Sequence, residues 1–225
     1  MLTQPQVQRY AVESGLRDIM IAEKEVALTF LLQLLSERGI LDRLAFKGGT
    51  CLRKMFLGNQ GRFSTDLDFT GIEEHDHEDV ILAMMGAFEH PFYGIQFAIP
   101  DEGYYETQDG LSWSVNPTYT HDWKQAGSEI RLQISRRETP TLPTERRPQI
   151  EQSYFRFLPF KPSDLTCLPF PKSSPKTSTP AISATKRATS TILACSLQGR
   201  SIRRSSAVSL SSSSGRRGMP SIPRG

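Results

Sequence analysis

Two aspartates one residue apart, Asp66 and Asp68, are the residues of this chain whose spacing most directly predicts chemistry. Polar and apolar residues alternate from Phe63 to Thr70, which predicts a strand whose side chains at positions i and i+2 share one face. Carboxylate oxygens are preferred ligands of Mg²⁺, and two neighbouring carboxylates suit a pair of metal ions roughly 3.5–4 Å apart. The pair is therefore predicted to be a catalytic magnesium site of the two-metal type.

A glycine turn precedes these aspartates, in the sequence Lys47-Gly48-Gly49-Thr50. The apolar residues 44–46 predict a buried strand that enters the turn, and helical spacing resumes after it. Unhindered backbone amides and the positive end of a helix bind phosphate oxygens. We therefore expect Gly48 and Gly49 to hold a triphosphate, with the Thr50 hydroxyl as a further donor and Lys47 as a positive charge.

Four more residues could assist this site. Arg62 and Ser64 precede Asp66 at even spacing, so the alternation places them on the face of the aspartates, where they could position phosphate or order the carboxylates. Arg53 and Lys54 follow the glycine turn closely, and we expect them to add positive charge near the phosphates.

Neither half of this pattern is specific by itself. A pair of glycines before a helix is most often a tight turn, and an Asp-x-Asp sequence is often a solvated strand face. Nucleotidyl transfer, however, requires both a place for a triphosphate and a carboxylate pair for magnesium. Here both occur in order, separated by one helix and one turn. A phosphate-binding P-loop is excluded because the chain contains no G-x-x-x-x-G-K-[ST] sequence.

The elements that must position these residues follow from the spacing of apolar residues. Helical spacing from Gln8 to Glu37 predicts two helices separated at Gly15. The other predicted elements are helices over 51–56 and 80–88 and strands over 44–46, 63–70, 96–99, 111–115 and 129–135. This order predicts an α/β (α+β) fold with N-terminal helices and a mixed sheet that carries the site.

Composition is that of an ordinary globular protein. At 225 residues the chain can form one domain with a sizeable core, or one domain and an appendage. Its apolar runs are too short for a transmembrane helix and its N-terminus lacks a secretion signal, so we expect a cytoplasmic protein without a membrane partner. Three cysteines, far apart and without a C-x-x-C pair, argue against a disulfide framework or a zinc ribbon.

Charge is distributed unevenly along the chain. All 24 acidic residues lie at or before Asp164, whereas the segment from Pro171 onward contains ten Lys or Arg and no acid. The first 170 residues thus carry 17 basic and 24 acidic residues, a net charge of −7. We predict a nucleotidyltransferase-like domain over 1–165, irregular from about 139 onward, and a low-complexity, basic, Ser-rich and disordered tail over 166–225.

The segments FKGGTCLRK and RFSTDLDF resemble the AbiEii/AbiGii-type nucleotidyltransferase toxins of the polymerase-beta-like superfamily, closely over residues 46–70 and more loosely over 8–165. The resemblance implies that Gly48, Gly49 and Thr50 hold the triphosphate and that Asp66 and Asp68 hold magnesium. It also implies a toxin of a toxin-antitoxin, or abortive infection, system that transfers a nucleotide from an NTP to an RNA, typically tRNA. A separately encoded antitoxin would be its protein partner.

The chain departs from the family's pattern in two places. Such enzymes commonly add a third carboxylate from a later strand, and the strand 129–135 offers only Glu129, a weak metal-ligand candidate, with Gln133 where an aspartate would be natural. Beyond Cys167 the chain also lacks the family's later helices and their Ala-Arg-Asp-x-x-Asp motif. Read in another frame, the segment 171–207 is compatible with a helical sequence that contains this motif, so we hypothesise that the tail is translated out of frame.

Two alternative functions stay open. If the tail is a frameshift product, the chain is a catalytically impaired remnant of such an enzyme. If the tail is a native segment, its basic residues could bind RNA phosphates without base specificity, although it lacks aromatic residues for stacking.

A few other residues have both a functional and a structural interpretation. His75 and His77 lie between acids and could bind a transition metal, but a solvated helix start is more common. Cys51 follows the glycine turn and could be an activated thiol, although a buried small side chain is more typical. Four aromatic residues could stack on a nucleobase, although packing in the protein is the more ordinary role of such side chains. They are Tyr104, Tyr105, Trp113 and Tyr119.

Overall fold

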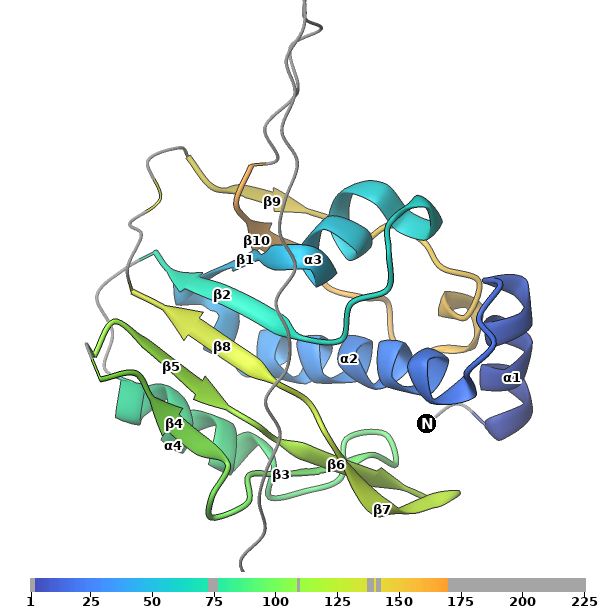
Figure 1. Ribbon diagram of the computed structural model, residues 1–225, viewed down its shortest axis with the longest axis horizontal. Helices are drawn as coiled ribbons and strands as arrows, with labels where there is room; N and C mark the ends of the chain where they lie inside the picture. Colours follow the sequence, from blue (N-terminus) through green and yellow to red (C-terminus); the bar gives the residue numbers. More distant parts are fainter. Residues whose placement is uncertain (1–2, 73–76, 109, 137–139, 141–142, 170–225) are drawn as a thin grey trace, which may run out of the picture. The chain divides into compact units, whose positions relative to one another are not determined.

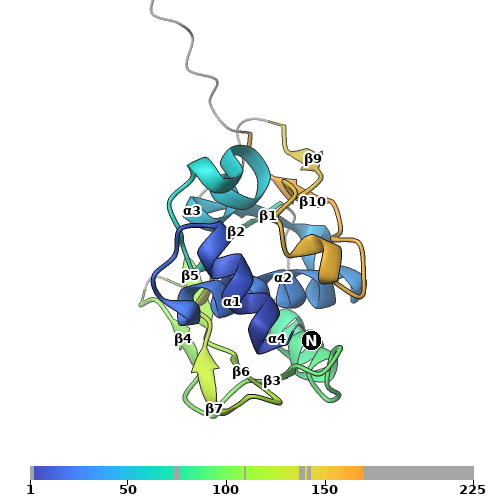
Figure 2. The same cartoon turned by 90° about the vertical axis from the view of Figure 1, so that its right-hand side faces the viewer.

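The structure is a computed structural model that describes residues 3–72, 77–108, 110–136, 140 and 143–169. A seven-stranded mixed sheet has the order β4-β5-β8-β2-β1-β10-β9, and a smaller sheet has the order β3-β6-β7 (Figure 1). Helices α2 (Ile19–Glu37) and α4 (His77–Ala87) lie on one side of the larger sheet, as Figure 2 shows from the side. The predicted α/β (α+β) class is confirmed.

The remaining elements are short. The larger sheet consists of β1 (Leu44–Lys47), β2 (Leu67–Gly71), β4 (Tyr104–Glu106), β5 (Ser112–Val115), β8 (Leu132–Ser135), β9 (Glu145–Arg147) and β10 (Leu165–Cys167). The smaller sheet consists of β3 (Gln96–Ala98), β6 (Thr118–His121) and β7 (Lys124–Glu129). Helical segments are α1 (Gln4–Glu13), η1 (Ile40–Arg43), α3 (Gly48–Cys51), the π-helical η2 (Leu52–Leu57), η3 (Gly58–Gln60) and η4 (Phe155–Phe157).

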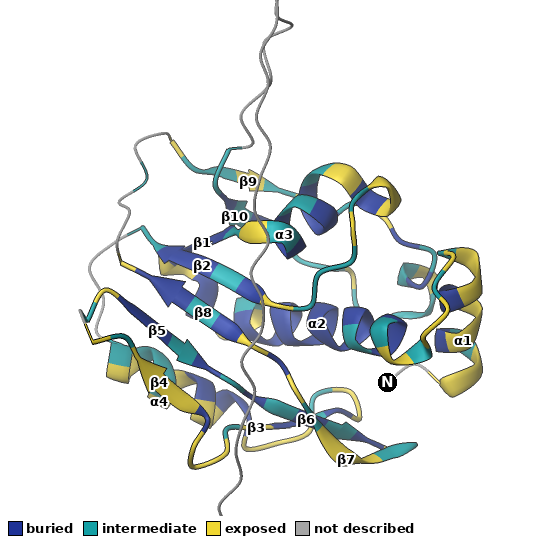
Figure 3. Ribbon diagram, in the orientation of Figure 1, coloured by how far each residue is buried: buried dark blue, intermediate teal, exposed yellow. Residues whose placement is uncertain are grey.

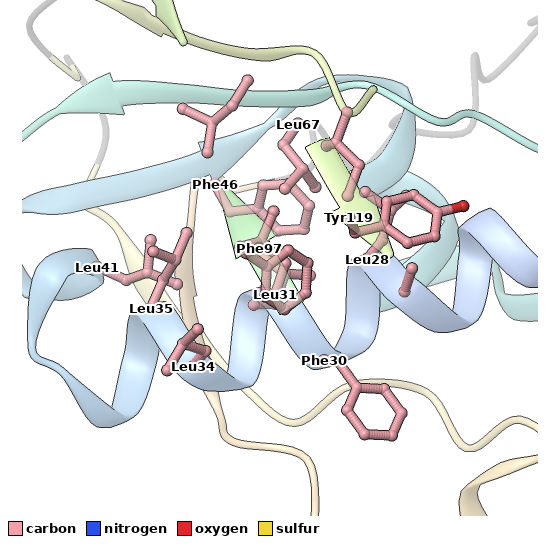
Figure 4. Packing of buried hydrophobic residues seen from close by; sticks show 14 of the residues in the cluster. Leu28, Phe30, Leu31, Leu34, Leu35, Leu41, Phe46, Leu67, Phe97 and Tyr119 are labelled. Atoms are coloured by element: carbon pink, nitrogen blue, oxygen red, sulfur yellow. The ribbon is translucent and has the colours of Figure 1, made fainter. Parts of the chain in front are cut away.

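Helix α2 is the centre of the core, because almost every residue from Ala22 to Leu35 is buried (Figure 3). Figure 4 shows Leu28 and Leu31 of this helix beneath Phe46 of β1 and Leu67 of β2. Fully burying each such side chain stabilises the fold by about 1.5–3 kcal/mol. The packing therefore fixes β1 and β2, the two strands that flank the glycine turn and the aspartates, against one rigid helix.

The ends of α2 follow the sequence signals. The Asp18 carboxylate accepts a hydrogen bond of 2.8 Å from the Met20 amide and caps the N-terminus. Gly39, at φ 70°, adopts the left-handed conformation that ends a helix. Gly15, at φ 69°, lies between α1 and α2 as predicted.

Three predicted segments differ from the structure. The strand expected over 63–70 begins only at Leu67, and the strand expected over 129–135 is interrupted, so that its first residue ends β7 and its last four form β8. The Pro-rich segment expected to be irregular contributes β9 and β10, and β10 pairs in parallel with β1. Long-range pairing creates these short strands, which local sequence preferences do not predict.

The predictions of a disordered, basic, Ser-rich tail and of its out-of-frame origin concern residues 170–225, which lie outside the described part of the chain. The acidic segment 73–76, which includes His75, also lies outside it. Of the helices that the structure describes, none combines the length and the apolar character needed to cross a membrane.

A buried ion cluster joins α2 to η2. The Glu25 carboxylate lies 2.9 Å from the Lys54 ammonium and 3.7 Å from the Arg53 guanidinium, and all three side chains are at most 2% exposed. Lys54 also donates to the Thr29 hydroxyl at 2.8 Å. The expectation that Arg53 and Lys54 add charge near the phosphates is therefore wrong, because both are paired inside the core.

A second buried carboxylate joins α2 to the smaller sheet. Glu23 accepts hydrogen bonds from the Tyr119 hydroxyl at 2.9 Å and from the Lys124 ammonium at 2.8 Å, and its oxygen lies 3.4 Å from Nε2 of His121. Burial lowers the pKa of His121, and the bond to Glu23 only partly opposes this shift. The histidine is thus held neutral in the folded protein.

We predict that Glu25→Gln destabilises the fold by about 3–5 kcal/mol, because it leaves Arg53 and Lys54 buried without a counter-charge. Urea unfolding followed by circular dichroism measures the loss. Glu89→Gln is the matched control, since Glu89 is an exposed glutamate outside the buried ion cluster. Equal stability of the two variants would contradict the prediction.

We also predict that His121 makes stability depend on pH. Its pKa is lowered on folding, so the unfolded chain binds more protons as the pH falls through about 6.5, and the free energy of unfolding decreases there. Urea unfolding at about pH 7.5 and pH 5.5 should show a larger decrease for the wild type than for His121→Gln. The same decrease in both proteins would count against this role.

Candidate active site

The glycine turn and the second aspartate are brought together by the antiparallel pairing of β1 and β2. Lys47, the last residue of β1, lies opposite Asp68 in the register of the two strands. Gly48 follows immediately with φ +79°, and a Cβ atom at this position would lie 2.2 Å from Oδ2 of Asp68. Only glycine combines this conformation with such a close approach, so the turn's main chain lies directly against the carboxylate.

The second glycine lies against the loop that precedes β2. A Cβ atom on Gly49 would lie 3.1 Å from the Ser64 hydroxyl oxygen and 3.7 Å from Nη2 of Arg62. Both predicted residues are therefore next to the turn, although they belong to a loop and not to a strand as expected. The structure places a hydroxyl and an exposed guanidinium beside the backbone that is predicted to hold phosphate.

Thr50 has a different partner from the one that the sequence suggested. It is completely buried, and its hydroxyl donates a hydrogen bond of 2.5 Å to the main-chain carbonyl of Asp66. This contact ties the helix after the glycine turn to the residue that carries the exposed carboxylate. Thr50 thus positions Asp66 from inside the protein.

The two aspartates repel each other electrostatically. The pKa of Asp68 is raised, first because the carboxyl group is half-buried and second because of the negative charge of Asp66, while Lys47 and Arg131 oppose the shift. A cation placed between the carboxylates would relieve this repulsion. The electrostatics therefore favour a bound cation at this position.

The ligand set available for such a cation is small. In the described residues no three or more His, Cys, Asp or Glu side chains are grouped to hold a metal ion. Mg²⁺ nevertheless binds in many enzymes through one or two carboxylates, with water and substrate phosphates as its other ligands. Asp66 and Asp68, next to the turn that is predicted to bind phosphate, fit this pattern.

The structure separates Glu129, the weak candidate for a third metal ligand, from Gln133, which stands where an aspartate would be natural. Gln133 of β8 lies opposite Asp68 of β2 in parallel register, so its amide is the nearest neighbour along the sheet. Glu129 lies at the end of β7, in the smaller sheet and opposite Thr118. Arg131, between them in sequence, is exposed and close enough to influence the charge of Asp68.

Cys51 is a structural residue. Its side chain is buried, and its thiol donates to the Phe46 carbonyl at 3.3 Å. The neighbouring Cys167 thiol and burial raise the pKa of Cys51 far above its ordinary value. An activated thiol at this position is therefore contradicted, since such a thiol requires a lowered pKa.

The four aromatic candidates fall into different environments. Trp113 and Tyr119 are 1% exposed and belong to the core. Tyr104 packs at the sheet edge against His77 and Trp113. Tyr105, by contrast, is 63% exposed, so it alone of the four presents most of its ring to solvent.

We predict that Gly48→Ala abolishes tight binding of Mg²⁺ or Mn²⁺, because the added methyl group must displace the Asp68 carboxylate and the residue must keep a positive φ. Calorimetric titration with Mn²⁺ measures the effect. Gly86→Ala in α4 is the control, since a Cβ there meets nothing within 4 Å. Unchanged Mn²⁺ affinity of folded Gly48→Ala would disprove the role of the turn.

Known proteins resemble this chain in sequence and in structure. The family described as "Nucleotidyl transferase AbiEii toxin, Type IV TA system" matches residues 29–173. Among solved structures, the chain is similar to MenT4, a nucleotidyltransferase toxin from Mycobacterium tuberculosis H37Rv, with a TM-score of 0.60 and 30% sequence identity. That match covers 75% of this chain and 55% of MenT4.

A weaker structural match is JHP933 from Helicobacter pylori, with a TM-score of 0.37, 20% identity and coverage of 54% of this chain and 46% of that one. No curated protein matches the sequence. The family match extends over more than half of the chain and includes the glycine turn, both aspartates and strand β8. The chain belongs to the AbiEii family of nucleotidyl transferase toxins.

Proposed function

We propose that this chain is a magnesium-dependent nucleotidyltransferase that moves a nucleotide from an NTP to an RNA acceptor, with tRNA as the expected class. In this proposal it acts as the toxin of a toxin-antitoxin pair in the cytoplasm, where NTPs and tRNA are found. The observation that carries the proposal is the direct approach of the Gly48 main chain to the Asp68 carboxylate. This approach supports the proposal because it brings the turn that would bind phosphate next to a carboxylate that would bind metal.

The residues of the glycine turn would hold the triphosphate. Gly48 is exposed and Gly49 is partly exposed, the Arg62 guanidinium lies beside Gly49, and Lys47 directly precedes the two glycines. Backbone amides and fixed cations stabilise phosphate charge without reorganising during the reaction. The β- and γ-phosphates would therefore rest on the turn, and the α-phosphate would lie towards the aspartates.

Asp66 and Asp68 would hold magnesium. When bound, the metal supplies a lowered pKa for the attacking hydroxyl group and neutralises charge on the leaving pyrophosphate. In the transfer, a bond forms between the acceptor oxygen and the α-phosphorus as the bond from that phosphorus to the bridging oxygen breaks. The proton of the acceptor hydroxyl would pass to water, and pyrophosphate would leave along the glycine turn.

A catalytically impaired remnant is the second candidate. It is favoured by the extent of the family match, which ends at residue 173 and leaves out most of the tail of this chain. If the tail is a frameshift product, the basic and acidic groups expected to complete the nucleotide pocket would be lost with the family's later helices. Restored transfer after replacement of residues 171–225 by the alternative-frame sequence would support this candidate.

We predict that Asp66→Asn and Asp68→Asn each lower transfer of labelled nucleotide from NTP to total tRNA by on the order of 10³-fold or more, because metal-held charge contributes several kcal/mol to the transition state. Removal of divalent cations with EDTA should have the same effect. Gel analysis of radiolabelled RNA measures the product.

Asp42→Asn is the matched control, because Asp42 is an exposed aspartate in η1. It should transfer label at the wild-type rate. Wild-type transfer by Asp66→Asn, or transfer that persists in EDTA, would reject the proposed mechanism.

A further inference from the structure

The glycine turn fixes the side from which an acceptor must approach. In-line displacement requires the attacking and leaving oxygens to lie on opposite sides of the transferred phosphorus. The turn that would receive pyrophosphate follows β1, on one side of Asp68. The attacking hydroxyl must therefore arrive from the other side, where β8, β5 and β4 follow in the sheet.

A row of polar side chains extends across these three strands. Gln133 of β8 lies opposite Asp68, Ser114 of β5 lies opposite Gln133, and Tyr105 of β4 lies opposite Ser114. Residues that are opposite in register share one face of a sheet. Gln133 and Ser114 are half-buried, whereas their neighbours on each strand are buried in the core, so the row lies on the face away from α2.

On this face the row is partly exposed, whereas the next row along the same strands, Thr70, Ser135 and Ser112, is buried. Helices α2 and α4 lie behind the sheet, and no described helix covers the front of β8, β5 or β4 (Figures 1 and 3). With strands about 4.8 Å apart, Tyr105 lies three strands, or about 14 Å, from the strand of the aspartates. The row thus forms a path that leads from the catalytic carboxylates to an exposed aromatic ring.

The chemistry of the row suits single-stranded RNA. Its amide and hydroxyl can form hydrogen bonds with sugars and base edges, and the 63% exposed ring of Tyr105 offers a stacking surface for a splayed base. The row contains no carboxylate beyond Asp68, although the first 170 residues carry more acids than bases. Exposed Arg131, at the start of β8, provides a cation for a phosphate beside the reaction centre.

We propose that Gln133, Ser114 and Tyr105 form the acceptor subsite, which holds the terminal nucleotides of a single-stranded RNA end while its hydroxyl attacks the NTP. This inference rests on the proposed function. Gln133 contacts the terminal nucleotide, next to the metal-binding pair. Tyr105 stacks on a base farther from the terminus, because the distance along the row exceeds the reach of the last nucleotide alone.

The test compares three variants in steady-state transfer to tRNA. Tyr105→Ala should raise KM for RNA by about 5- to 150-fold, the effect of losing one stacked base, with KM for NTP unchanged. Tyr105→Phe keeps the ring and should restore the wild-type value. Leu82→Ala is the control, since Leu82 is an exposed apolar residue of α4, behind the sheet. An unchanged KM for RNA in Tyr105→Ala would overturn the acceptor subsite and leave the proposed function intact.

RNA affinity provides a readout that is independent of catalysis. Fluorescence anisotropy with a labelled single-stranded RNA should show weaker binding for Tyr105→Ala and for Ser114→Glu, which adds a negative charge to the path. If the wild type transfers no nucleotide, the proposed function is wrong. Independently of that result, equal RNA affinity of the wild type and these variants would overturn the acceptor subsite. Label that appears on protein and not on RNA would also overturn it.

Discussion

The close contact between the Gly48 main chain and the Asp68 carboxylate is the constraint on which the site depends. A side chain at position 48 would occupy the space of the carboxylate oxygen, so the turn and the aspartate can share one place only if the residue is glycine. The contact also explains why Asp68 is partly desolvated and why its pKa is raised next to Asp66. Two carboxylates held this close together cost free energy when no cation is bound. The same repulsion makes the site favour a positive charge.

The rest of the fold maintains this contact. Pairing of β1 with β2 sets the register that places Lys47 opposite Asp68, and both strands pack on α2. Behind the turn, the buried pair of Glu25 and Lys54 joins α2 to the helix that follows the glycines. The Thr50 hydroxyl adds a direct tie to the Asp66 carbonyl. A functional constellation requires support of this kind, because small displacements of catalytic groups reduce rates strongly.

The two sides of the aspartates have different chemistry, and this asymmetry gives the proposed reaction a direction. On the β1 side lie the exposed glycine turn and the cations of Lys47 and Arg62, which suit a phosphate leaving group. On the β8 side lie an amide, a hydroxyl and an exposed aromatic ring, which suit nucleosides better than phosphates. A sheet can present both because adjacent strands contribute neighbouring side chains to the same face.

The sequence by itself determined the residue types, their order and their local conformation. The spacing of Asp66 and Asp68, the paired glycines and the helical periodicity of α2 are local properties, and they sufficed to predict the class of fold and the candidate site. Tertiary structure decided which charges belong to that site. Arg53 and Lys54 are much closer to the glycines in sequence than Asp66 is. They nevertheless lie outside the site, because they are buried against Glu25.

Tertiary structure also decided what lies beside the aspartates. Strand register joins Gln133, Ser114 and Tyr105 into one row across three strands, and it leaves Glu129 in the smaller sheet. Hydrogen-bond pairing between distant segments sets this register, and a shift of one residue would turn every side chain to the other face. Local sequence preferences contain no information about that choice, because it depends on the burial of a whole face against α2.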